Sequence, residues 1–90
     1  MAELLNKERL IKLPSFGIID NAEILDNIKE RGVAYVYNGI VPNSYEGYVY
    51  CFTSTVNNGA VQIYFAYNGS DKKYRVFDWS TQKWTNWMQL

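Results

Sequence analysis

Few residues of this 90-residue chain are suited to chemistry. The chain has no histidine, so it lacks the side chain best suited to proton transfer near neutral pH and to binding first-row metals. Cys51 is the only cysteine, so an internal disulfide and a thiolate cluster are excluded, and we expect Cys51 to be a small buried hydrophobic residue. The sequence therefore predicts no catalytic triad, no metal site and no cofactor.

Paired carboxylates are the remaining catalytic possibility. Glycoside hydrolysis needs two acids that face each other across about 5 to 10 Å. Beyond residue 34 only Glu46 and Asp78 form a pair worth testing, because Asp71 is expected in a loop. The alternative is that both are ordinary solvated acids at strand ends, and on this balance we expect that the chain is not an enzyme.

The charge balance also limits the partners. Lys72, Lys73 and Arg75 surround Tyr74 in a pattern that resembles a basic and aromatic nucleic-acid patch. However, nine Lys and Arg balance nine Asp and Glu, which leaves no overall positive field for a polyanion. No run reaches the length of a transmembrane helix, and the first residues are too charged for a signal peptide. We expect no nucleic-acid and no membrane partner.

Charged and aromatic residues divide the chain into two parts. Residues 1–34 hold eleven charged side chains and one aromatic ring, whereas residues 35–90 hold seven charges and fourteen rings. Asp20 followed by Glu23 resembles a capping box, which predicts one short helix near residues 21–30. A helix-leaning start therefore precedes a β-rich body.

The ends of this first part are less well defined. Gly32 is expected to supply the positive φ that a helix end often needs. The first dozen residues suit a short amphipathic helix and an extended arm equally well, and Pro14 ends either one.

After Gly32 the apolar period becomes two, which is typical of strands. Asn-Gly pairs favour tight turns, and three are present: Asn38-Gly39, Asn58-Gly59 and Asn68-Gly69. The strands predicted between them, with a short final one, are residues 33–37, 48–55, 60–67, 74–78 and 84–88. The fold class is mainly β: a small antiparallel β-meander or sandwich-like domain with one short N-terminal helix.

A register for the central strands assigns side chains to two faces. Phe52 is placed opposite Ile63, and Phe65 opposite Val76. The face predicted as the core holds Tyr48, Tyr50, Phe52, Val61, Ile63, Phe65, Tyr67, Tyr74 and Val76. The other face, which is too apolar to be simply solvated and is expected to be partly covered, holds Val49, Cys51, Thr53, Gln62, Tyr64, Ala66, Arg75, Phe77 and Trp79.

Several motifs follow one another from residue 24 to the end of the given sequence. They are the segment Leu25-Asp26-Asn27-Ile28-Lys29-Glu30-Arg31-Gly32-Val33-Ala34-Tyr35-Val36-Tyr37, the loop Val41-Pro42-Asn43-Ser44, the strands Gly47-Tyr48-Val49-Tyr50 and Gln62-Ile63-Tyr64-Phe65, and the close Trp84-Thr85-Asn86-Trp87-Met88-Gln89-Leu90. In order and spacing they resemble the knob domain of bacteriophage and pyocin tail fibres. Arg31 stands where the family usually has proline, and Ala34 where a larger residue is common.

This resemblance implies a knob-like β domain over residues 24–90, preceded by an arm or linker over residues 1–23. It implies a virion tail-fibre or baseplate protein that is assembled in the bacterial cytoplasm, is often trimeric and contacts other tail proteins. Such a knob is positioned to bind a glycan of the host surface. The alternative is a purely structural domain that trimerises or caps the fibre, with recognition performed elsewhere.

Two surfaces are candidates for a carbohydrate ligand, because sugar CH faces stack on rings and polar side chains take the hydroxyls. One is a platform on the second face: Gln62, Tyr64, Arg75 and Trp79. Its alternative is that this face is a trimer interface or is covered by residues 1–30. The other is a loop surface, for which ordinary turn chemistry is the alternative: Asn43, Ser44, Tyr45 and Asn57.

The two tryptophans of the terminal motif are three residues apart. In a strand this spacing places Trp84 and Trp87 on opposite faces. One is therefore expected to seal the core edge, and the other to lie on the surface or at a subunit contact.

Overall fold

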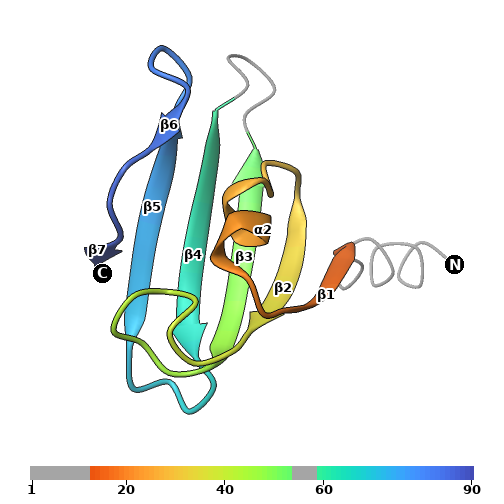
Figure 1. The fold of residues 1–90 in the computed structure, drawn as a ribbon, viewed down its shortest axis with the longest axis vertical. Helices are drawn as coiled ribbons and strands as arrows, with labels where there is room; N and C mark the ends of the chain where they lie inside the picture. Colours follow the sequence, from red (N-terminus) through yellow and green to blue (C-terminus); the bar gives the residue numbers. More distant parts are fainter. Residues whose placement is uncertain (1–12, 54–58) are drawn as a thin grey trace, which may run out of the picture.

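Seven strands form one mixed sheet in the computed structural model, which describes residues 13–53 and 59–90 (Figure 1). The elements are β1 (Ser15–Ile19), α2 (Ala22–Asp26), β2 (Gly32–Val36), β3 (Gly47–Thr53), β4 (Ala60–Ala66), β5 (Lys72–Asp78), β6 (Lys83–Trp84) and β7 (Met88–Gln89). The sheet order follows the chain from β1 to β5, and both β6 and β7 pair with β5. The predicted mainly β fold with one short helix is confirmed.

Strands β2 to β5 form the predicted antiparallel meander. Both predicted pairings were wrong. Phe52 pairs with Val61 instead of Ile63, an error of two residues. Phe65 pairs with Lys72 instead of Val76, an error of four residues. The second error arises because the β4–β5 turn is shorter than expected and β5 already begins at Lys72. Since both errors are even numbers of residues, the predicted grouping of side chains into two faces is correct.

Strand β1 lies at the sheet edge and runs parallel to β2, although it falls within the segment predicted as an arm. Its Phe16 ring packs on Gly32, where an added Cβ would lie 2.3 Å from a ring carbon. Gly32 is thus the first residue of β2 rather than a helix end, and it is needed for this close approach.

The helix is shorter than predicted and has a different cap. Asn21, not Asp20, is the N-cap residue, and its side-chain oxygen accepts a hydrogen bond from the Glu23 backbone N–H at 2.8 Å. The helix ends at Asp26, and its buried residue is Leu25.

Two of the three Asn-Gly turns are confirmed, because Gly39 and Gly69 have φ values of 80° and 76°. The third pair includes Asn58, which lies outside the described residues, as do Asn57 and the predicted helix or arm over the first dozen residues.

One face of the sheet is covered and the other is open. Helix α2 and the β2–β3 loop (residues 37–46) lie across one face, in front of the sheet in Figure 1. The main core cluster lies beneath them: Ile19, Leu25, Ala34, Val36, Val41, Val49, Tyr64 and Ala66. The face predicted as the core is therefore the open one, because the helix and the loop cover the opposite side.

Candidate functional site

The candidate site is built around Arg75 of β5. Its guanidinium carbon lies 4.5 Å from the ring centroid of Trp84 and 4.6 Å from that of Trp87, so both indoles stack on one cation. Its Nη1 forms an ion pair with Oδ1 of Asp26 at 2.8 Å. Only 6% of Arg75 is exposed. We call Arg75, Trp84 and Trp87 the arginine clamp.

The clamp joins the sheet to the helix. Arg75 Nε donates to Gln62 Oε1 at 2.9 Å, and Gln62 Nε2 donates to the carbonyl oxygens of Leu25 and Ile28 at 2.9 and 3.0 Å. The indole N–H of Trp84 donates to the carbonyl of Asp26 at 2.8 Å. These hydrogen bonds serve the carbonyl groups of Asp26 and Ile28, at and just beyond the end of α2, and give the Leu25 carbonyl a second donor besides the Ile28 backbone N–H.

Both tryptophans can stack on Arg75 because the chain leaves the sheet between them. β6 ends at Trp84 and β7 begins only at Met88, so the alternation rule for a continuous strand does not apply. The expectation of opposite faces was wrong for this reason.

The electrostatics of the clamp follow from its burial. Desolvation lowers the pKa of Arg75 from its usual value, and the ion pair with Asp26 opposes that change. Among the described residues, the Arg75 Nη2 atom is buried and has no hydrogen-bond partner. A buried donor without an acceptor is costly, which makes this atom unusual.

An open pocket of about 660 Å³ adjoins the clamp. Besides the clamp residues, its lining includes Asp26, Pro42, Asn43, Lys73, Lys83 and Asn86. It therefore brings together side chains from α2, the β2–β3 loop, β5 and the terminal segment.

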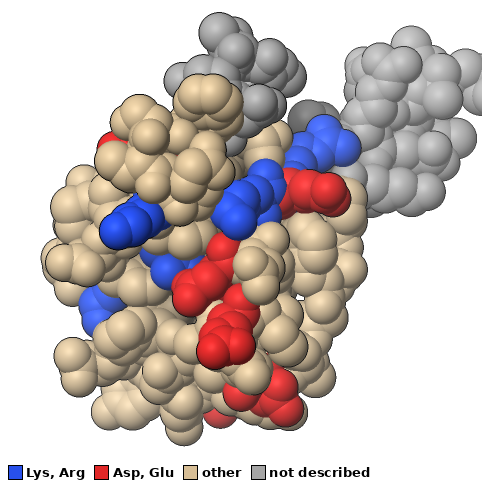
Figure 2. All heavy atoms as spheres, turned by 45° about the horizontal axis from the view of Figure 1, so that its top comes forward, with Lys and Arg blue, Asp and Glu red and all other residues tan. Residues whose placement is uncertain are grey.

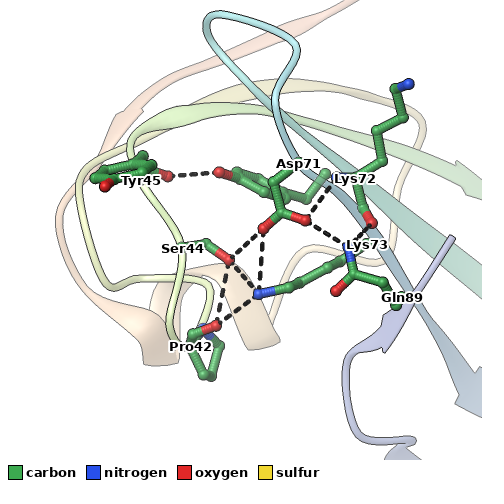
Figure 3. A network of polar contacts seen from close by, with 8 residues as sticks. Pro42, Ser44, Tyr45, Asp71, Lys72, Lys73 and Gln89 are labelled. Atoms are coloured by element: carbon green, nitrogen blue, oxygen red, sulfur yellow. Dashed lines mark hydrogen bonds and ion pairs between the residues drawn. The ribbon is translucent and has the colours of Figure 1, made fainter.

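A polar network fixes the loop side of this pocket (Figure 3). Lys73 Nζ donates to the carbonyl of Pro42 at 3.1 Å and to the Ser44 hydroxyl at 2.6 Å, and it pairs with Asp71 at 3.3 Å. Gln89 Nε2 donates to the same carboxylate, and this hydrogen bond is the main reason that the pKa of Asp71 lies below its usual value.

The residues of the predicted platform do not form an exposed surface. Gln62 and Tyr64 are fully buried, and the Tyr64 hydroxyl donates to the carbonyl of Tyr45 at 2.8 Å. Arg75 is closed off within the clamp, and only Trp79 is exposed, by 51%. The platform was predicted wrongly, and its stated alternative, cover by residues 1–30, holds in part because α2 lies over this face.

The predicted loop residues are placed differently. Tyr45 is 65% exposed, and Asn43 is exposed with a positive φ of 59°. Asn43 lines the pocket beside Arg75, so the structure brings together one residue from each predicted surface. Lys83 and Asn86 were missed, because nothing in their sequence context distinguishes them from ordinary loop residues.

The possible acid pair is separated by the length of the sheet. Gly47, the residue after Glu46, pairs with the last residue of β4. Phe77, the residue before Asp78, pairs with the first residue of β4. Glu46 and Asp78 therefore lie at opposite ends of this strand. Six residues of strand span about 20 Å. This distance is too large for a glycosidase pair, so the hypothesis of hydrolysis by Glu46 and Asp78 was wrong.

The basic cluster is likewise divided. Lys72 points to the open side of β5, whereas Lys73 and Arg75 point to the covered side. Acidic and basic side chains adjoin one another on the face shown in Figure 2. Within the described residues no helix is long and apolar enough to cross a membrane, and no group of three potential metal ligands occurs.

The open face is the second notable surface. Its central positions are all apolar or aromatic: Val33, Tyr35, Tyr48, Tyr50, Phe52, Val61, Ile63, Phe65, Tyr74 and Val76. Tyr48 and Phe52 are 44% and 42% exposed. Edge-to-face contacts order the rings, with centroid distances of 5.2 Å for Tyr35 and Tyr48 and 5.9 Å for Tyr50 and Phe65.

Comparison with protein-family models, curated proteins and solved structures found no significant match to this chain.

Proposed function

We propose that this chain is a non-enzymatic knob domain of a bacteriophage tail fibre or baseplate, and that three copies assemble through the open face. In this proposal the protein belongs to the virion tail and contacts other tail proteins. Host-surface carbohydrate recognition is its second role. The proposal rests on the ordered motifs between Leu25 and Leu90 and on one structural observation, the aromatic open face, whose central positions carry no charge.

This face has the composition of a subunit interface. Cores of such interfaces are rich in aromatic residues and depleted in charge, and exposed apolar patches of several hundred Å² mark interaction sites. Four strands about 4.8 Å apart and about 24 Å long present roughly 450 Å² before side-chain relief is counted. The central positions of the face carry no charge, and the charged residues on this side of β5, Lys72 and Asp78, lie at its two ends. Copies of the face therefore meet at their centres without like-charge repulsion, so further copies of this chain are suitable occupants.

The width of the face suits three copies. Three sheets about 19 Å wide, arranged as a triangular prism, place the threefold axis about 5.5 Å from each sheet. This distance is close to half of the roughly 10 Å that separates packed sheets. The side chains of the open faces would therefore fill the prism interior.

The assembly is tested by measuring the solution mass of the purified chain at micromolar concentration by light scattering. We expect about 31.5 kDa, three times the 10.5 kDa of one chain. Ile63→Lys places a charge at the centre of the open face and should give a folded monomer. Ile24→Lys is the matched control, because Ile24 is exposed on α2 and its replacement should leave the trimer intact.

A monomeric wild-type chain at this concentration would overturn the assembly proposal, as would an unchanged mass of the Ile63→Lys variant. The virion assignment is tested separately by the neighbouring genes. Tail or lysis genes beside this one support it, and neighbours without any phage gene contradict it.

Host recognition is distinguished from a purely structural role by cell binding. A variant that still assembles but no longer binds host cells supports recognition by this domain. If wild-type trimers bind neither host cells nor host surface glycans, the purely structural alternative is supported.

A further inference from the structure

The same tripeptide begins two loops at one end of the sheet. Tyr37-Asn38-Gly39 follows β2 and Tyr67-Asn68-Gly69 follows β4, and the two glycines have similar φ values of 80° and 76°. Both strands pair antiparallel with β3, so they run in the same direction and finish at the same end of the sheet, the lower end in Figure 1. The two tripeptides therefore lie on either side of β3, about 10 Å apart.

Glu46, the residue before β3, joins the two tripeptides. Its backbone N–H donates to Asn38 Oδ1 at 2.6 Å, and its carbonyl accepts from the Tyr67 backbone N–H at 3.1 Å. Both loops are thus held to the same residue by hydrogen bonds, and its side chain lies between them.

We call Tyr37, Glu46 and Tyr67 the end row, because they form one row across the end of the sheet. They are the next residues beyond the last paired positions of β2, β3 and β4, which lie on the covered side: Val36, Gly47 and Ala66. Since alternate residues of a strand point to opposite sides, the end row points to the open side. Tyr37 and Tyr67 are 48% and 60% exposed, so a carboxylate lies between two exposed rings.

Contacts with Tyr35, which lies on the open side of β2, support this placement. The Tyr35 hydroxyl donates to Glu46 Oε2, and this hydrogen bond is the main reason that the pKa of Tyr35 is raised to about 12. Tyr67 contributes to the same rise, so its hydroxyl is also near. Among the described residues, the second carboxylate oxygen of Glu46 and the hydroxyls of Tyr37 and Tyr67 have no hydrogen-bond partner.

These groups suit a neutral saccharide. Sugar CH faces stack on exposed rings, and an ionised carboxylate is a strong acceptor for hydroxyl groups. Asn38 and Asn68 are exposed and use only their Oδ1 atoms within the chain, so their Nδ2 amides are donors for further hydroxyls. We infer that the end row and these two amides bind a neutral saccharide whose hydroxyl groups donate to Glu46.

This inference deepens the carbohydrate-recognition part of the proposed function and rests on it. The end row lies beyond the last paired residues of three strands, at the mouth of the proposed prism. Assembly through the centre of the open face therefore leaves it accessible and gathers three rows at one end, which adds avidity. Because each row belongs to a single chain, the monomeric Ile63→Lys variant should bind a monosaccharide as well as the trimer does.

The test is an NMR titration of the full chain with glucose, galactose, mannose and N-acetylglucosamine. The side-chain amide signals of Asn38 and Asn68 and the ring signals of Tyr37 and Tyr67 report on the site. We expect at least one of these sugars to shift them saturably with a Kd of about 1 mM, as is usual for a small weak ligand. Glucuronate and glucosamine are the charged probes and should bind less tightly than the best neutral sugar.

Tyr67→Ala removes one exposed ring and should weaken binding about 3- to 10-fold. The matched control is Tyr45→Ala, which should leave the affinity unchanged. Tyr45 is 65% exposed and adjoins Glu46 in sequence, but by alternation it points to the covered side. Only its carbonyl, which the variant retains, accepts from Tyr64.

Glu46→Gln retains an acceptor for the Tyr35 hydroxyl and removes the charge, and it should weaken binding about 3- to 10-fold. Its matched control is Glu30→Gln, an exposed acid before the other end of β2, which should have no effect. The inference is overturned if none of the four sugars gives a saturable shift up to about 20 mM, if a charged probe binds more tightly, or if both end-row variants keep the wild-type affinity.

Cell binding separates this inference from the proposed function. If host cells bind the Tyr67→Ala, Glu46→Gln double variant as well as the wild type, recognition by the domain stands and the end row is not the site. If the double variant loses cell binding although no sugar shifts the wild-type signals, the row binds a protein receptor and the saccharide inference is wrong. If the wild type binds no cells, the recognition part of the proposed function itself fails.

Discussion

The two faces of the sheet are built from similar residues but are held in different ways. The covered face buries Tyr64 and Gln62 completely and gives each of them hydrogen-bond partners in the loop or the helix. The open face carries even more aromatic side chains, which contact one another and leave Tyr48 and Phe52 more than 40% exposed. Hydrophobic content alone therefore does not determine which face becomes the core.

The difference lies in the polar anchors. On the covered face, Gln62, Tyr64 and Arg75 each satisfy backbone or side-chain groups of the covering elements. Within the described residues, the central positions of the open face have one comparable polar contact, the hydrogen bond from Tyr35 to Glu46. Anchors of this kind fix α2 and the β2–β3 loop to one side, which leaves the other side available for copies of the chain.

The largest expected difference between the faces is seen in two adjacent residues. Tyr64→Ala should lower the free energy of unfolding by about 3 to 5 kcal/mol, because it opens a cavity and removes the hydrogen bond to Tyr45. Phe65→Ala, measured by urea denaturation in the monomeric Ile63→Lys background, should cost less than about 2 kcal/mol, because Phe65 is only partly buried. Equal losses would contradict the assignment of the faces.

Cysteine reactivity provides a second comparison. Burial raises the pKa of the Cys51 thiol to about 11, so little thiolate is present at pH 8. Alkylation by iodoacetamide, followed by mass spectrometry, should be at least about 100-fold slower for Cys51 than for an exposed thiol. The comparison thiol is Phe52→Cys in a Cys51→Ser, Ile63→Lys background, which places the group on the open face of a monomer. Similar rates would show that the covered face opens readily.

The polar anchors are tested by Gln62→Leu, which removes the donors to the Leu25 and Ile28 carbonyls and the acceptor for Arg75. We expect a loss of about 2 kcal/mol in the free energy of unfolding. Gln89→Leu is the matched control: its exposed amide also makes hydrogen bonds, and water can replace them at a cost below about 1 kcal/mol. A neutral Gln62→Leu would mean that apolar packing alone holds the helix.

The smallest effect is expected from pH. The pKa of Asp71 is lowered in the folded chain by Gln89 and then by Lys73, so the ionised carboxylate stabilises the fold. This contribution is complete above the unfolded pKa of about 3.9 and is lost as the pH falls through the lower folded pKa. Asp71→Asn should therefore lower Tm at pH 7, and the difference from wild type should shrink below about pH 4.

Asp20→Asn is the control for this titration, because the Asp20 side chain makes no hydrogen bond or ion pair with the described residues. Its Tm should follow that of the wild type across the same range. A difference between Asp71→Asn and wild type that persists unchanged at pH 2 would contradict the role of the carboxylate charge.

Much of the architecture follows from local pattern. The alternation after Gly32 predicted the meander, the Asn-Gly pairs predicted the turns at Gly39 and Gly69, and the parity of the strands sorted the side chains correctly into two groups. These features depend on residues close together in sequence, for which turn chemistry and the pleat of a strand are decisive.

The site itself was only partly predictable. Arg75 and Asn43 were predicted as candidate binding residues by type, but they were assigned to two separate surfaces. Their meeting in one pocket depends on the β2–β3 loop folding back over β5 and on the chain leaving the sheet between Trp84 and Trp87. Neither event leaves a mark in the local sequence pattern.

The sequence by itself thus determined strands β2 to β5, their order and which of their side chains share a face, because these depend on a period of two and on turn residues. Only the tertiary structure decided which face is buried, because both faces are apolar and the choice depends on distant contacts. Gln62 and Arg75 anchor helix α2, and the hydrogen bond from Gln62 reaches Leu25, 37 residues earlier in the chain. This anchoring makes the less aromatic face the core. The open aromatic face and the clamp pocket are the two consequences.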